Sequence, residues 1–378
     1  MAESSGVAFL LHDAGETEAL RPVIARLAQA HVPYTLLTTG TASRLLAGHP
    51  HQVSLPDAPV AGTPTQQAAW WQQMTTLCQR LHPAVVMTGV VSPFQQLLSG
   101  LFRRQGAPVV GYTDGYTLNP TTELFQRFAK TLSAWWVPTA VQAAWLRQCL
   151  PQMPVAVVGQ PTADRWERQN LSASPATTDA ATQTPLTAPS TPQTLQPPPR
   201  LLWVGGYGAG YEEAFGLFCS LARQWAGRAQ FQVALHPSQD GAVERQWIDR
   251  MGLTGLVEIL PKHQPTERAL AQASAVLTQD SSMVVQGLML GKPVLLTGPP
   301  VNPTQWNAPV AQGLLSRYTK VETLAAELLQ QLRQPPADPS EASRQVRNQL
   351  GLPNHSALRM AEQLQQHCAE STKPVYAR

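Results

Sequence analysis

Short apolar runs alternate with amphipathic stretches along most of the chain. In the first half the runs occupy residues 6–11, 34–40, 84–89, 107–115, 133–139 and 155–161. Apolar residues then recur at helical spacing after the first run, at Ala19, Leu20, Val23, Ile24 and Leu27. Apolar runs separated by helical spans of about a dozen residues are typical of buried parallel strands joined by crossover helices. The first half therefore predicts an α/β unit with a parallel sheet.

The second half repeats this style. Its strand candidates are residues 200–206, 231–237, 257–261, 275–282 and 292–298. Helical patterns are expected at residues 212–226, 268–274, 284–290, 321–332 and 355–367, and Pro-rich residues 335–343 are expected to interrupt the chain.

Residues 171–199 separate the two halves. They are Ser, Thr, Pro, Ala and Gln with one charged residue, Asp179. Such a composition cannot bury enough apolar surface to offset the entropy of ordering, so it predicts a flexible linker or surface insertion. The domain boundaries we expect are 1–168, 169–199 for the linker, 200–335, and a C-terminal helical segment 336–378.

Composition narrows the function classes. Only 13% of the 378 residues are charged, and the net charge of +3 is too balanced to indicate nucleic-acid or membrane binding. The four cysteines are scattered without a CxxC spacing, so we expect neither a metal site nor a redox motif. The start of the sequence lacks a basic segment before its short apolar run, and no stretch is long enough to span a bilayer. A reduced, cytoplasmic protein is the simplest expectation, and the oligomeric state, including a homodimer, stays open.

Candidate binding residues in the second half follow directly after strands. In open α/β sheets, ligands bind beyond the carboxyl ends of the strands. A glycine-rich turn lies between the first strand and helix of this half, where free N–H groups can hold a phosphate, although a plain tight turn is equally compatible. His236 and His263 follow later strands, and Asp280, Ser281 and Ser282 end one strand and open a helix that carries Gln286. Asp280 or Ser281 could instead only cap that helix. The glycines of the turn are Gly205, Gly206, Gly208 and Gly210.

In the first half, His12 and Asp13 lie in the loop after the first strand, which we expect to continue through Glu16 and Thr17. Asp114 follows a later strand at the same sheet edge. A histidine or carboxylate there could act as the general base for an acceptor hydroxyl, whereas Asp13 or Thr17 could merely cap the next helix. The paired tryptophans at 70–71 and 135–136 are expected in the core rather than in a sugar platform.

The chain resembles the glycosyltransferase-B (GT-B) fold superfamily, and within it the UDP-N-acetylglucosamine 2-epimerase branch. The resemblance rests on the opening strand–loop–helix GVAFLLHDAGETEALRPVIARL, the runs NPTTELFQRFAKTLSAWWVPT and VAVVGQPTADRW, and FQVALHP. It also rests on DSSMVVQGLMLGKPVLL and the closing pattern GLPNHSALRMAEQL. It implies two Rossmann-like domains with parallel sheets facing a central cleft and a last helix that packs back on the first domain. It also implies that Asp280, Ser281, Ser282 and His236 contact the diphosphate and sugar of a nucleotide sugar.

The sequence departs from the epimerases at several acidic positions. The first loop reads HDAGETE in place of an Arg-Pro-Glu, YTDGYT stands where the family has Glu-Ala-Gly-Leu-Arg, and Gln286 is the nearest counterpart of a pair of acidic residues. Three functions are therefore compatible with the sequence. A glycosyltransferase with an unknown acceptor is favoured, and a 2-epimerase-like isomerase and a non-catalytic binding protein are the alternatives. The favoured scheme needs no metal or other cofactor, because the nucleotide-diphosphate sugar is a substrate.

Overall fold

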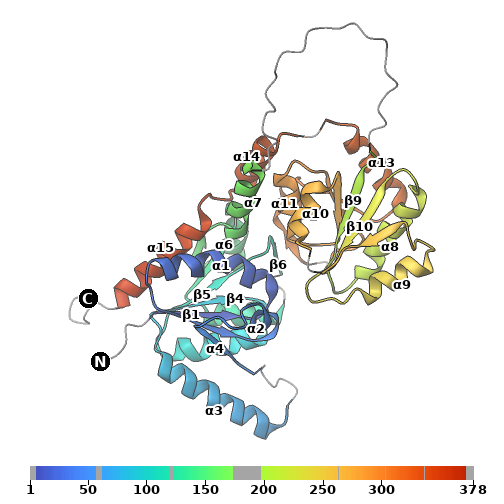
Figure 1. Cartoon of the computed structure of the whole chain (residues 1–378). Helices are drawn as coiled ribbons and strands as arrows, with labels where there is room; N and C mark the ends of the chain where they lie inside the picture. The colour runs from blue at the N-terminus through green and yellow to red at the C-terminus, as the bar shows by residue number, and fades with distance from the viewer. Residues whose placement is uncertain are drawn as a thin grey trace, which may run out of the picture. The chain divides into compact units, whose positions relative to one another are not determined.

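The computed structural model of the chain describes residues 6–56, 62–119, 122–172, 197–262, 264–302, 304–335 and 337–371. These residues divide into two compact units. The first contains the described residues up to Asp164, the segment Thr304–Gly313 and the described residues from Arg347 onward. The second contains the described residues from Arg165 to Asn302 and the described part of Leu314–Val346. Both are α/β units, as the sequence predicts (Figure 1).

A seven-stranded parallel sheet forms the centre of the first unit, in the order β3-β2-β1-β4-β5-β7-β8. The central strands β1, β4 and β5 are buried over their whole length, which explains why they appear in the sequence as apolar runs. The strands are β1 (Val7–Leu11), β2 (Tyr34–Thr38), β3 (Gln52–Ser54), β4 (Val85–Gly89), β5 (Val109–Tyr112), β7 (Ala134–Val137) and β8 (Val155–Val157).

Helices cover both faces of this sheet. On one face, α1 (Ala14–Gln29) and α15 (Ser356–Ser371) share a buried cluster with Phe9 and Leu11, and they lie side by side in Figure 1. On the other face, Ala8 and Leu10 belong to a cluster with residues of α3 and α4 and their neighbours. Residues of α3 (Pro64–Leu81), α4 (Pro93–Arg104), α5 (Glu123–Thr131) and α6 (Ala140–Cys149) belong to this second cluster, whereas α2 (Gly40–Leu45) contributes Ala42 to the first. Trp70, Trp135 and Trp136 are buried, so the expectation that the tryptophan pairs belong to the core holds for these three side chains.

Segment Thr304–Gly313 interrupts the second unit and packs within the first. Its short strand β14 (Trp306–Asn307) pairs antiparallel with β6 (Thr117–Leu118), and α12 (Ala308–Ala311) follows. The Trp306 ring stacks on Trp145 of α6, with ring centroids 4.9 Å apart and planes at 10°. The domain predicted at residues 200–335 included this segment, whereas the structure places it in the first unit.

The second unit has a six-stranded parallel sheet in the order β11-β10-β9-β12-β13-β15. Its strands are β9 (Arg200–Val204), β10 (Gln230–Ala234), β11 (Val257–Ile259), β12 (Ala275–Thr278), β13 (Val294–Thr297) and β15 (Arg317–Tyr318). Its helices are α8 (Tyr211–Gln224), α9 (Ala242–Arg250), α10 (Thr266–Gln272), α11 (Met283–Met289) and α13 (Val321–Leu332). Trp203, Phe215 and Phe218 lie at the centre of its core.

Two helices contain the points at which the chain passes from one unit to the other. Helix α7 (Pro161–Ser172) continues into the start of the segment expected to be a linker, whose residues 173–196 lie outside the described part. Helix α14 (Pro339–Leu350) begins inside residues 335–343, where the sequence predicted only an interruption. Proline is tolerated in the first turn of a helix, and Asp338 accepts hydrogen bonds from the Ser340 and Glu341 N–H groups, so the Pro-rich start does not prevent this helix. Asp164 pairs with Arg347 of α14 and accepts from the Ser356 N–H.

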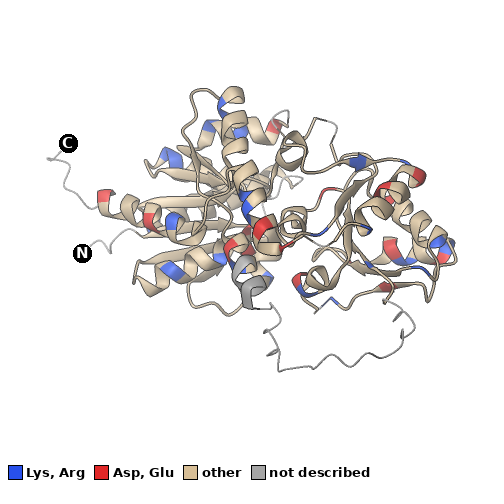
Figure 2. Cartoon of the chain, turned by 90° about the horizontal axis from the view of Figure 1, so that it is seen from above, with Lys and Arg blue, Asp and Glu red and all other residues tan. Residues whose placement is uncertain are grey.

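Charged residues of both signs are interspersed on each unit (Figure 2). Within the described part of the chain, no helix is long and apolar enough to cross a membrane.

Candidate functional site

The strand order of the first unit reverses between β1 and β4. Chain leaving β1 enters α1 on one face of the sheet, and chain leaving β4 enters α4 on the other face. A crevice beyond the carboxyl ends of two such strands is the usual ligand position in a doubly wound sheet. The acidic candidates of the first half lie at this position.

Asp13 is the N-cap of α1. Its carboxylate accepts a hydrogen bond from the Glu16 N–H at 3.0 Å, and the Glu16 carboxylate accepts from the Asp13 N–H in return. This reciprocal pair is a capping box, which sequence spacing can predict. The expectation that Glu16 and Thr17 lie in the loop was wrong, because the box starts the helix at Ala14 and buries both side chains.

Glu16 is completely buried and receives hydrogen bonds from two elements. The Gln95 Nε2 on α4 donates to both Glu16 carboxylate oxygens, at 2.7 and 2.8 Å, and the His12 N–H donates from the other side. Burial, followed by the charge of Asp13, raises the pKa of Glu16 well above its ordinary value, and the bonds from Gln95 and His12 act in the opposite direction. Sequence analysis missed this role, because Gln95 is 79 residues away and no local pattern connects the two.

Asp114 lies beside the same turn. A Cβ atom at Gly15 would be 2.4 Å from Asp114 Oδ2, so a larger residue at position 15 would displace that carboxylate. Burial, followed by the charge of Asp13, raises the pKa of Asp114 to about 7, although bonds from backbone N–H groups oppose the shift. The structure therefore brings Asp13 and Asp114 together, as the sequence predicts, and adds Glu16 to them.

His12 is held by its own contacts. Its Nδ1 lies 2.8 Å from the Thr39 Oγ1, and the ring lies against Gly40. The residue is partly exposed, as Asp114 is, so exposure does not distinguish the two as contacts for a bound molecule.

In the second unit, the strand order reverses between β9 and β12. The predicted glycine-rich turn lies here: Gly205 and Gly206 follow β9, and Gly210 is the N-cap of α8, which has no side-chain cap. Two acidic residues, Glu212 and Glu213, lie exposed in the first turn of this helix. Their charge competes with an anion for the same helix end.

His236 follows β10, and its backbone lies directly against Gly205. Its Nδ1 accepts the Ser238 N–H at 3.2 Å, which places the proton of a neutral ring on Nε2 and makes Nε2 a donor. The exposed ring of Tyr207 packs edge-on to the His236 ring, with centroids 4.7 Å apart. Tyr207 was not a sequence candidate, since a single aromatic residue in a glycine-rich turn carries no motif.

The residues after β12 differ in the contacts that their side chains make. Asp280 pairs with Arg317 of β15 and accepts the Val301 N–H at 2.9 Å, so its carboxylate is not the cap that the sequence allowed. Ser281 Oγ accepts the Met283 N–H, and Ser282 is an exposed N-cap without a side-chain bond. Gln286 is buried in α11, and its Oε1 has no hydrogen-bond partner among the described residues. His263 lies outside the described residues.

Gln279 connects the loops of this edge. Its Nε2 donates to the Ala209 carbonyl at 2.8 Å and to the Pro299 carbonyl at 2.9 Å, which ties the glycine-rich turn to the loop after β13. The turn, His236 and the start of α11 therefore form one edge of the second unit.

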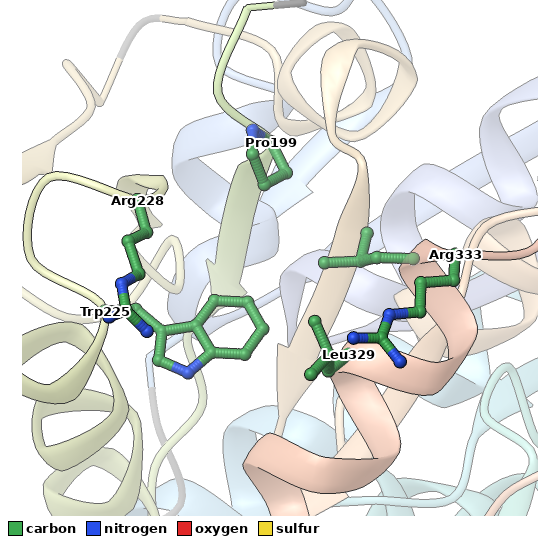
Figure 3. A pocket seen from close by; sticks show the side chains of 6 residues that line it. Pro199, Trp225, Arg228, Leu329 and Arg333 are labelled. Carbon is green, nitrogen blue, oxygen red and sulfur yellow. The ribbon is translucent and has the colours of Figure 1, made fainter.

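A groove of about 260 Å³ lies elsewhere on the second unit (Figure 3). Trp225, Leu329, Leu332 and Pro199 form its apolar part, and Arg228 and Arg333 flank it. Pro199 precedes β9, whereas the glycine-rich turn follows this strand, so the groove lies at the opposite end of the sheet from the predicted binding residues. Both arginines come just after the carboxyl ends of helices, where positive charge complements the helix dipole.

Within the described ranges, no group of three or more His, Cys, Asp and Glu side chains is placed to hold a metal ion.

No family model and no curated protein sequence matches the chain. Solved structures do match it. The UDP-GlcNAc 2-epimerase of Neisseria meningitidis, bound to UDP-GlcNAc, is 15% identical with a TM-score of 0.67, covering 95% of this chain and 99% of that one. A putative UDP-N-acetylglucosamine 2-epimerase from Listeria monocytogenes is 14% identical with a TM-score of 0.68 and 99% coverage of both chains. A glycosyltransferase from Rickettsia africae is 11% identical with a TM-score of 0.61, covering 98% and 99%.

The chain has the glycosyltransferase-B fold. The resemblance in fold inferred from the order and spacing of the sequence motifs is thereby confirmed, and it extends over nearly the whole length of these structures. In this GT-B fold, the candidate residues form two sets, an acidic set at the switch point of the first unit and a glycine–histidine–serine set at the switch point of the second.

Proposed function

We propose that the chain acts on a nucleotide-diphosphate sugar and transfers the sugar to an acceptor hydroxyl. The observation that carries this proposal is the carboxyl group of Asp114, whose pKa of about 7 suits a general base at neutral pH. The fold supports the class of substrate, since structures that share it include an epimerase bound to UDP-GlcNAc.

The second unit would bind the donor. The first-turn N–H groups of α8, the Ser282 hydroxyl and the Nε2–H of His236 can donate to diphosphate oxygens. The same donors would stabilise the negative charge that the nucleoside diphosphate acquires as the bond to the sugar breaks. The scheme requires no metal or other cofactor.

The first unit would supply the acid–base group. Asp114 takes the proton of the acceptor hydroxyl while the acceptor oxygen forms its bond to the anomeric carbon and the nucleoside diphosphate leaves with the bonding electrons. Asp13 favours this step, because its charge raises the proton affinity of Asp114.

Isomerisation of the sugar is the second candidate. Its support is the set of structural neighbours, several of which are UDP-GlcNAc 2-epimerases, together with a first-unit edge that carries Asp13, Glu16 and Asp114. An isomerase converts the nucleotide sugar without any acceptor, whereas a transferase releases the nucleotide only when an acceptor hydroxyl or water takes the sugar.

The first experiment is thermal unfolding with UDP, GDP, CDP and dTDP and their common sugar conjugates. A ligand that binds only the folded state raises the midpoint by mass action. A shift with one nucleotide that is lost in His236→Ala but kept in Asp114→Asn supports donor binding by the second unit. No shift with any compound favours a non-catalytic binding protein and contradicts the proposal.

The second experiment follows turnover of the nucleotide sugar that binds. Product analysis by NMR, with and without a panel of sugar and lipid acceptors, separates the two reactions. Acceptor-dependent release of nucleotide that Asp114→Asn abolishes supports the transferase. Conversion to a second nucleotide sugar in buffer alone supports the isomerase.

A further inference from the structure

A buried pair joins the two faces of the first sheet at its switch point. Glu16 on α1 and Gln95 on α4 are both fully buried, and the Gln95 Nε2 also donates to the Leu10 carbonyl of β1 at 3.1 Å. Since α1 and α4 pack on opposite faces, the pair spans the ends of β1 and β4.

The orientation of Gln95 is fixed from its other side. Its Oε1 accepts the Val91 N–H at 3.2 Å and the Ser92 N–H at 3.1 Å, so only its NH2 group can face Glu16. Space for the Glu16 carboxylate comes from Gly89, where a Cβ would lie 1.3 Å from Oε2. Any other residue at position 89 would expel the carboxylate.

The pair holds the turn that carries Asp13. Glu16 Oε1 accepts the N–H groups of His12 and Asp13, and the same turn continues through Gly15, against which Asp114 rests. A capping box alone requires only the bond between Glu16 and the Asp13 N–H. The additional bond from the His12 N–H holds the turn itself, and the bonds from Gln95 tie the turn to α4.

We propose that Glu16, anchored by Gln95, is a positioning residue that keeps Asp13 beside Asp114. This inference rests on the proposed function for its consequence in turnover. The part of the inference that concerns structure, namely that the Glu16–Gln95 pair keeps the Asp13 charge next to Asp114, does not depend on the proposed function.

Three variants test the pair. Glu16→Gln places a second NH2 group against the Gln95 NH2 group, and Gln95→Leu removes the donor. The exchange Glu16→Gln with Gln95→Glu restores a donor facing an acceptor and keeps one carboxyl group in the pair, although it loses the bond to Leu10.

The chain offers a matched control. At the start of α3, Gln66 completes an equivalent capping box with Thr63, on an exposed surface away from the carboxylates. Gln66→Leu removes this box, so it measures the effect of losing a capping residue without touching the acidic set.

The first readout is the titration of Asp114 in the full-length chain, followed by the ¹³C shift of its carboxyl carbon and assigned with Asp114→Asn. We expect Gln95→Leu to lower the midpoint by about one pKa unit, because Asp13 moves away from Asp114. Glu16→Gln should lower it at least as much, because it also removes the Glu16 carboxyl group, which interacts with Asp114. Asp13→Asn should lower it similarly. The exchange variant should return it toward the wild-type midpoint, and Gln66→Leu should leave it unchanged. An unchanged midpoint in both single variants overturns the inference.

The second readout is turnover of the nucleotide sugar. We expect about a hundredfold fall in kcat in the single variants with the KM for the nucleotide sugar within about twofold, and recovery in the exchange variant. Equal losses in the single and exchange variants, with a constant Asp114 midpoint, overturn the positioning role. If the wild-type chain turns over no nucleotide sugar, the proposed function fails, while the titration still decides the inference. Circular dichroism checks folding, and if Gln95→Leu does not fold, Glu16→Gln and the exchange variant decide the outcome.

Discussion

Replacing Asp114 by Asn should make the first unit more stable at neutral and alkaline pH. The carboxyl group ordinarily titrates near 3.8, and burial and Asp13 raise its pKa to about 7 in the folded chain. Below pH 4 the group is protonated in both the folded and unfolded states. As pH rises from 4 to 7, the unfolded chain loses this proton and the folded chain retains it, so stability falls over this window.

The shift sets the size of the effect. A difference of about three pKa units corresponds to about 4 kcal/mol. Asp114 as a residue is partly exposed, and solvent screens its charge, so we expect roughly half of this, about 2 kcal/mol. The stability of Asp114→Asn relative to wild type should therefore rise by about 2 kcal/mol between pH 4 and pH 8.

Hydrogen exchange measured by mass spectrometry can isolate the first unit, through peptides that cover β1, β4 and β5. Core strands exchange through the global opening of their unit, and the intrinsic pH dependence of exchange cancels between variant and wild type at each pH. Glu362→Gln removes a charge from an exposed side chain of α15 and serves as the control. A stability difference between Asp114→Asn and wild type that does not change with pH would refute the reasoning.

Three further perturbations have definite expected outcomes. Neutralising the first turn of α8 with Glu212→Gln and Glu213→Gln should tighten nucleoside diphosphate binding by about 1 kcal/mol in calorimetry at low salt, and weaker binding would contradict an anion site at this helix end. His236→Ala should raise the Kd of the same ligand about tenfold, since it removes the Nε2–H donor, and an unchanged Kd would place the diphosphate elsewhere. Trp306→Ala should lower the free energy of unfolding of the first unit by about 2 kcal/mol because it removes the stack on Trp145, whereas Trp306→Phe should recover part of the loss.

The main features of the fold were predictable because parallel strands are buried on both faces. Runs such as VAFLL of β1 have no polar residue to interrupt them, and glycine marks the ends of several strands and helices. The sequence analysis did not predict helix α14, because its sequence is polar, begins with proline and has no clear apolar stripe at helical spacing.

Sequence analysis could predict only those site residues whose positions follow from the neighbouring sequence. Asp13, Asp114 and the glycine-rich turn follow strands directly, and their positions at sheet edges come from strand order. Glu16 depends on Gln95, and Asp280 depends on Arg317, which are partners from distant parts of the chain. Tertiary contacts of this kind leave no periodicity in the sequence.

The packing of α15 on α1 also bears on how the protein is made. Met360, Ala361 and Leu364 belong to the same buried cluster as Leu20 and Ile24. During synthesis, the apolar face of α1 therefore emerges from the ribosome more than three hundred residues before the helix that covers it. The first unit cannot complete its core until α15 has been synthesised, and a fragment that stops at residue 168 would keep that face exposed and prone to aggregation. Production of the first unit alone thus requires α15, fused or supplied as a second chain.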